Sequence, residues 1–147
     1  MTALHHGAIR VGDLEASLRF YRDGIGLAVL MDHEFDGPWR ELFDAPADRL
    51  RSVFLGDPEH PDAGIVELVA FVEARPGEAL SPGDGRGFLL LSFFVDVDAT
   101  LARLGTLGFE APPRRVELPG PREPVTMATV RDPDGVLVEL VGAAAAS

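Results

Sequence analysis

Cysteine, lysine, asparagine and glutamine are all missing from this chain of 147 residues. Without cysteine the protein can form no disulfide, no thiolate metal site and no cysteine nucleophile. Without lysine, all 13 basic residues are arginine, and against 24 acidic residues they leave a formal net charge of −11. The missing residue types are typical of codon bias in a high-GC genome. The negative charge argues against binding to nucleic acid or to anionic membranes, because both need clustered cations.

Long apolar runs and a basic leader are missing as well. No stretch reaches the roughly eighteen apolar residues that a membrane span needs. The N-terminus, MTALHHGAIRVGDLE, lacks the basic-then-apolar pattern of a secretory signal. We therefore expect a cytoplasmic protein whose partners are a small molecule and a second copy of the chain in a homodimer. The length suits one domain or two small fused modules.

What the chain does contain is an internal repeat. Residues 6–27 and 89–108 align when Asp13 is placed on Asp96, 83 positions further along, and a glycine follows the expected helix in both copies, Gly26 in the first and Gly108 in the second. Such self-similarity at a fixed offset is the mark of a repeated structural unit.

A second pair of segments repeats in the same order. Residues 51–71 match residues 126–142, with Asp-Pro followed by Val-Glu-Leu in both. The shared order indicates a duplication rather than a chance alignment of apolar stretches. The glutamates of the two Val-Glu-Leu triplets are Glu67 and Glu139.

Each copy predicts one βαβββ module. In the first copy, Asp13 is expected to cap a helix that Gly24 and Gly26 end. Period-two apolar alternation and turn residues place the other elements. The expected strands are residues 4–11, 27–35, 50–56 and 64–71 in the first copy and 88–95, 109–117, 125–131 and 136–142 in the second, with a second helix at 97–107.

The predicted fold class is α+β, with two tandem βαβββ modules forming curved mixed sheets around a shared cleft. We expect a first module at residues 1–74, a linker at 75–87 and a second module at 88–147. Residues 36–49 are unique to the first copy and are expected to form a loop with a short helical turn. A cleft between such modules is the expected binding site.

Strand alternation predicts which side chains face that cleft. Ile9 and Val11 suit the helix-packed side of the first strand, so His6 and Arg10 are expected to face the cleft. His5 is then expected to point away from it.

Two carboxylates are the most informative chemical feature. Glu67 and Glu139 each lie inside an apolar strand, at equivalent positions of the repeat. A carboxylate in such a place is costly to bury unless it is paired or metal-bound. Together with His6, the two glutamates suit a divalent ion such as Mn, Fe, Co, Ni or Zn.

These segments resemble a known family. HGAIRVGDLEASLRFYRDGIGL is similar to the first strand and helix of the vicinal oxygen chelate (VOC) superfamily, and RDPDGVLVELVG is similar to its closing hairpin. That superfamily includes glyoxalase I, methylmalonyl-CoA epimerase, extradiol dioxygenases, and fosfomycin- and bleomycin-resistance proteins. The resemblance covers about residues 4–142. It implies a divalent metal bound by the first and last strands of each module.

Carried onto this chain, the implied metal positions are His6, Glu67, Leu89 and Glu139. Leu89 stands where many relatives have a second histidine, and leucine cannot ligate a metal. A register shift by one residue does not help, because Phe88 and Leu90 offer no ligand either. An iron dioxygenase, which needs two histidines and a carboxylate, is therefore disfavoured.

Three functions remain open. The first is a metal-assisted isomerase, epimerase or lyase that acts on a small carbonyl compound through an enolate. In that hypothesis His6 and Glu139 hold the metal, Glu67 is a ligand or the base, and Arg10 and Trp39 contact substrate. The second is a metal-free ligand-binding or drug-sequestering protein whose cleft is lined by Leu89, Leu91 and Phe93. The third is a metal-free enzyme with Glu67 or Glu139 as general base.

Overall fold

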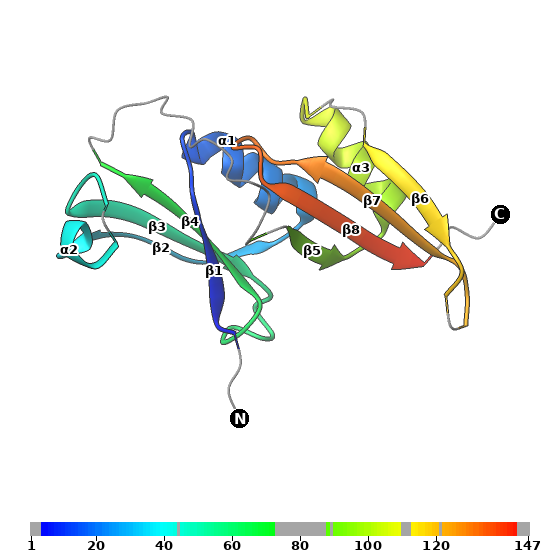
Figure 1. The fold of residues 1–147 in the computed structure, drawn as a ribbon, viewed down its shortest axis with the longest axis horizontal. Coiled ribbons are helices and arrows are strands. Elements are labelled where there is room, and N and C mark those ends of the chain that lie inside the picture. The colour runs from blue at the N-terminus through cyan, green and yellow to red at the C-terminus, as the bar shows by residue number, and fades with distance from the viewer. Residues whose placement is uncertain are drawn as a thin grey trace. The chain divides into compact units, whose positions relative to one another are not determined.

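The fold contains two four-stranded mixed sheets with helices, the α+β class expected from the sequence (Figure 1). Contacts divide the chain into two compact units, Met1–Arg22 with Gly26–Leu80 and Asp23–Ile25 with Ser81–Ser147. None of the described helices is long and apolar enough to cross a membrane. The computed structural model describes residues 4–43, 45–72, 88, 90–109, 113–120 and 122–143.

The two units have the same connectivity, which confirms the duplicated βαβββ modules. In the first sheet the strand order is β1-β4-β3-β2, and β1 pairs with β4 in parallel while the other pairs are antiparallel. The second sheet repeats this as β5-β8-β7-β6. The first module comprises β1 (His6–Arg10), α1 (Leu14–Leu18), β2 (Ala28–Asp36), α2 (Trp39–Phe43), β3 (Arg49–Gly56) and β4 (Ile65–Phe71). The second comprises β5 (Leu91–Phe94), α3 (Val97–Thr106), β6 (Arg114–Leu118), β7 (Val125–Arg131) and β8 (Leu137–Ala143).

The same cap begins the helix of each module. Asp13 accepts a hydrogen bond from the amide of Ala16, and Asp96 accepts one from the amide of Ala99, both at 3.0 Å. Each carboxylate thus satisfies an amide that has no partner within the first helical turn.

The first helix ends differently from the expectation. After Leu18 it continues as a π-helical segment, Arg19–Ile25, and Gly26 follows with a φ of 98°. Gly26 therefore ends the helix, because glycine takes this left-handed conformation without a steric penalty. Gly24 was expected to share that role but lies inside the π-helical segment.

Apolar side chains cover one face of each sheet. In the first module, Phe20 and Tyr21 of the π-helical segment are fully buried, as are Val53 and Leu68 of the sheet. In the second module the corresponding face is formed by β7 and β8, with buried residues Ala128, Val138 and Leu140, near which α3 contributes Leu104. These buried side chains do not cover the opposite face of the first sheet.

Strand boundaries differ from the sequence prediction mainly at β6. The strand was expected at residues 109–117 but runs from Arg114 to Leu118. Pro113 directly precedes it and has no amide hydrogen to donate to a neighbouring strand, so pairing begins after it. The expected linker at 75–87 lies outside the described residues.

Candidate functional site

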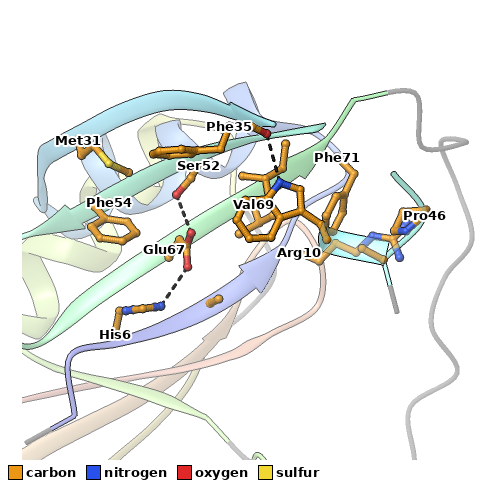
Figure 2. A pocket seen from close by; sticks show the side chains of 14 residues that line it. His6, Arg10, Met31, Phe35, Pro46, Ser52, Phe54, Glu67, Val69 and Phe71 are labelled. Atoms are coloured by element: carbon orange, nitrogen blue, oxygen red, sulfur yellow. Dashed lines mark hydrogen bonds and ion pairs between the residues drawn. The ribbon is translucent and has the colours of Figure 1, made fainter. Parts of the chain in front are cut away.

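A cavity of about 600 Å³ opens on the free face of the first sheet. Its wall comes from all four strands of the module and from the insertion that follows β2 (Figure 2). Side chains alternate along β1 as predicted, so His6, Ala8 and Arg10 line the cavity while Ile9 is buried on the other face. The remaining wall residues are Met31, Phe35, Trp39, Ala45, Pro46, Leu50, Ser52, Phe54, Glu67, Val69 and Phe71.

A hydrogen-bonded chain of three polar side chains lies in this wall. The hydroxyl of Ser52 donates to Oε1 of Glu67 at 2.6 Å, and Nε2 of His6 lies 3.2 Å from Oε2 of Glu67. Figure 2 shows the three side chains in line across β3, β4 and β1. The Glu67 side chain is 16% exposed and that of His6 37% exposed. Glu67 is therefore a partly buried carboxylate that is paired on both oxygens, in the centre of the sheet.

Aromatic rings support the histidine. The His6 ring packs against Phe54 with the ring centroids 5.3 Å apart. His5 was expected to point away from the cleft, and it is not part of the cavity wall. Its ring nevertheless contacts His6, with 2.8 Å between the two Nδ1 atoms. Both nitrogens of His6 thus have a neighbouring polar group, which restricts the orientation of the ring.

Arg10 and Trp39, both predicted to contact substrate, lie in the wall of the cavity. The guanidinium of Arg10 stands over the Phe71 ring, 5.6 Å from its centroid. Within the described part of the chain, no carboxylate forms an ion pair with Arg10. Trp39 begins α2 in the insertion, and its indole N–H donates to the carbonyl of Phe35 at 3.2 Å.

Sequence reasoning missed Ser52, Phe54 and Phe71. All three follow from alternation once the pairing of β3 with β4 is known, because Phe54 lies opposite Glu67 and Ser52 opposite Val69. A serine within the apolar run SVFLG was the available sign, since a buried hydroxyl needs a partner.

Glu139 occupies the matching position of the second module. It lies on β8 and accepts a hydrogen bond from the hydroxyl of Ser92 at 2.8 Å. The serine comes from β5 here, whereas Ser52 comes from β3. The two glutamates are therefore equivalent in the fold but differ in their surroundings.

The strand register corrects the predicted alignment by one residue. Glu67 pairs with Ala8 on β1, and Glu139 pairs with Ser92 on β5, which makes the offset 84 rather than 83 in these strands. The first copy has one residue more than the second between the first strand and the aspartate that caps the helix. That extra residue is Gly12, which directly precedes the cap Asp13. The position equivalent to His6 is then Leu90, and Leu89 itself lies outside the described residues.

The same shift determines the faces on which Leu91 and Phe93 lie. Leu91 pairs with Val138, and Phe93 pairs with Leu140. Both partners are fully buried on the face of the sheet that lies toward the helix. Leu91 and Phe93 therefore point to the face opposite Glu139. A one-residue slip moves every side chain of a strand to the other face, so a cleft lined by Leu91 and Phe93 would not include Glu139. Their role in ligand binding stays a prediction.

The donor atoms of His6 and Glu67 are compatible with a shared metal ion. Two ligands bound to one ion at about 2.1 Å, with an angle between tetrahedral and octahedral, lie about 3.0 to 3.4 Å apart. The 3.2 Å between His6 Nε2 and Glu67 Oε2 falls in that range. Across the described residues, no cluster of three or more metal-binding side chains is formed. The first module thus offers two of the three predicted ligands, and Glu139 belongs to the second module.

The fold and the site place the chain in a family. The sequence profile of the Glyoxalase/Bleomycin resistance protein/Dioxygenase superfamily matches residues 3–140. The chain belongs to this superfamily, as the sequence resemblance implied.

Individual relatives agree with this placement. The chain is 37% identical to the lactoylglutathione lyase-like protein terB of Aspergillus terreus, over 95% of this chain and 74% of that protein. It is 29% identical to a probable lactoylglutathione lyase of Synechocystis, over 94% and 93%. A glyoxalase family protein of Bacillus cereus has the same fold, with a TM-score of 0.72 at 18% identity over 99% of this chain and 96% of that one.

Proposed function

We propose that this chain is a glyoxalase-like enzyme that isomerises or cleaves a carbonyl compound through an enolate. The observation that carries the proposal is the Ser52–Glu67–His6 chain, which presents a partly buried carboxylate to an apolar cavity. The names of the two lactoylglutathione lyase relatives support the same reaction class.

Glu67 is the base in this proposal. Its carboxylate takes a proton from the carbon next to the substrate carbonyl, and the electron pair of the broken C–H bond forms the enolate. The resulting carboxylic acid then returns the proton to one of the two carbons of the enolate. The hydroxyl of Ser52 and the ring of His6 hold the carboxylate in one orientation, so it needs little rearrangement before the transfer. The cavity wall is mostly apolar, and the low polarity around the partly buried carboxylate strengthens its electrostatic interactions.

Of the three predicted ligands, His6 and Glu67 lie together in the first module and would hold a divalent metal there, whereas Glu139 belongs to the second module. Such an ion would polarise the substrate carbonyl and stabilise the enolate. Glu67 is then a ligand or the base, as the sequence left open. The second polar contact to substrate is Arg10, whose guanidinium can donate to a carbonyl or acidic oxygen.

A ligand-binding protein is the second candidate. The cavity wall carries the rings of Phe35, Trp39, Phe54 and Phe71, and apolar walls of this kind suit sequestration without chemistry. The paired carboxylate favours the enzyme, because a purely apolar ligand has no use for it. The homodimer and the cytoplasmic location stay predictions from the sequence.

Metal content and turnover test the proposal together. Protein purified without chelator or nickel resin is analysed for Mn, Fe, Co, Ni and Zn, and assayed for lactoylglutathione formation and for enolisation of other carbonyl compounds. We expect a stoichiometric metal that is lost in His6→Ala, and turnover that falls by about a thousandfold in Glu67→Gln. Leu42→Ala, which changes an exposed residue of α2 outside the cavity wall, serves as the control.

The outcomes separate the three functions. Metal-free protein with Glu67-dependent turnover supports the metal-free enzyme. Protein that turns over none of these compounds, yet keeps full ligand affinity in Glu67→Gln and Glu139→Gln, would sink the enzyme proposal in favour of the binding protein.

A further inference from the structure

The indole ring of Trp39 lies directly against Gly37, which has no side chain to displace it. A Cβ atom built on Gly37 would lie 2.7 Å from Cζ2 and 2.8 Å from Cε2 of Trp39, closer than real Cβ contacts come. The indole ring therefore lies against the backbone of Gly37, and any side chain at position 37 would push it aside. The hydrogen bond from the indole N–H to the Phe35 carbonyl also holds the ring in this orientation.

Further apolar surface faces the same cavity. Phe35, Phe54 and Phe71 contribute rings, and Met31 contributes a flexible thioether (Figure 2). Flat aromatic surfaces gain about 0.5–1.5 kcal/mol from offset or edge-to-face contact with another ring, beyond the area that they bury. A methionine adapts its shape to whatever lies against it. Such a wall favours a planar apolar group over a bulky saturated one.

Two polar residues of the cavity, His6 and Arg10, lie at opposite ends of β1. His6 and Arg10 are four residues apart on one face of the strand, so their Cα atoms are separated by about 13 Å. A cavity of about 600 Å³ with this polar spacing is much larger than a three-carbon carbonyl compound needs. The space between the two ends is bordered by Glu67, which lies opposite Ala8, and otherwise mainly by apolar side chains.

We infer that the Gly37–Trp39 corner of the insertion forms one wall of a slot for a planar apolar group, about the size of two fused rings, attached to the reacting carbonyl. The inference rests on the proposed function for the reaction, but the slot itself is a binding property. A peptide conjugate such as a glutathione adduct fits this wall poorly. Its two carboxylates and one ammonium group need several polar partners; Arg10 can meet one carboxylate, but the rings at the Trp39 corner offer no partner to the other groups.

Two probes with the same carbon skeleton and charge, one planar and aromatic and the other puckered and saturated, test the slot. Naphthalene-2-carboxylate is planar, and decahydronaphthalene-2-carboxylate has the same carbon skeleton and charge but is puckered. Titration calorimetry of the full-length protein with EDTA present makes the result independent of metal and turnover. We expect the planar probe to bind about tenfold more tightly, and S-methylglutathione to bind more weakly than either.

Variants of the corner assign the preference to Trp39. Trp39→Ala is expected to lose the tenfold preference, and Gly37→Ala to reduce it because the added methyl group displaces the indole. Trp39→Phe is expected to keep part of it, which guards against a loss caused by misfolding. Leu42→Ala, on the same short helix but outside the cavity wall, is expected to bind both probes like the unchanged protein.

Equal affinity for the two probes would overturn the inference, and so would an unchanged preference in a folded Trp39→Ala protein. Failure of the proposed function looks different. A protein that prefers the planar probe but turns over no carbonyl compound keeps the slot and loses the enzyme. A protein that forms lactoylglutathione but binds both probes equally keeps the enzyme and loses the slot.

Discussion

At the scale of single residues, Thr126 of β7 offers a direct test of packing. Its side-chain oxygen is buried and, within the described part of the chain, has no hydrogen-bond partner. A buried hydroxyl without a partner costs about 1–3 kcal/mol relative to an apolar group of the same shape. Thr126→Val is therefore expected to raise the free energy of unfolding by about 1 kcal/mol, measured by urea denaturation.

A threonine-to-valine substitution at Thr100 provides the control. The hydroxyl of Thr100 is equally buried but accepts a hydrogen bond from Arg103 at 3.0 Å. Thr100→Val removes that acceptor, so it should lower the stability. A stabilising Thr100→Val, or a destabilising Thr126→Val, would contradict this account of the two hydroxyls.

The candidate site shows what residue patterns reveal without a structure. His6, Arg10 and Glu67 could be predicted, because each stands out against the alternation of its own strand. Ser52 and Phe54 could not be placed, since the face on which they lie depends on the pairing of β3 with β4. Register between strands is a long-range property, so a single segment does not contain it.

At the scale of elements, side-chain ion pairs that titrate add to the backbone pairing between the edge strand β2 and β3. The guanidinium of Arg51 donates two hydrogen bonds to the carboxylate of Asp32, at 2.9 and 2.7 Å. These bonds, more than the accompanying charge attraction, hold the pKa of Asp32 below its ordinary value of 3.8. Arg49 adds a parallel contact to Glu34 at 3.0 Å.

The direction of the Asp32 shift sets the pH range of its effect. Because the pKa is lower in the folded state, Asp32 contributes its stability above pH 3.8 and loses it as the pH falls through the lowered value. Asp32→Asn should therefore be less stable than the unchanged protein near neutral pH, and the difference should shrink as the solution is acidified below pH 3.8. Urea denaturation across this pH range measures it. A difference that grows in acid would contradict the assignment, and Asp62→Asn in the exposed loop before β4 is the control.

Most elements could be predicted because their determinants are local. The caps Asp13 and Asp96 and the glycine after each helix mark the helix ends by their own chemistry. The face of β5 could not be predicted correctly, because one extra residue, Gly12, separates strand from helix in the first copy only. The helix caps match at an offset of 83, but strand pairing fixes the faces at 84.

At the scale of the whole molecule, the duplication was enough to predict two modules of identical connectivity. It could not predict that the described cavity lies within one of them. The copies differ where the cavity is made: the first has His6 and an insertion that carries Trp39, and the second has leucine in place of the histidine. A repeat predicts what two modules share, and this cavity depends on what they do not.

The location of the cavity within the first module has a thermodynamic consequence. All residues of the cavity wall belong to the first module, so a ligand bound there stabilises the folded state of that module directly. At a free concentration of about a hundred times Kd the added stability is about 2.7 kcal/mol. Hydrogen exchange with saturating naphthalene-2-carboxylate should slow about a hundredfold for amides of β1, β3 and β4 that exchange by opening of the module. Amides of β5 to β8 that exchange through local opening should keep their rates, so ligand would divide one repeated fold into a protected copy and an unprotected one.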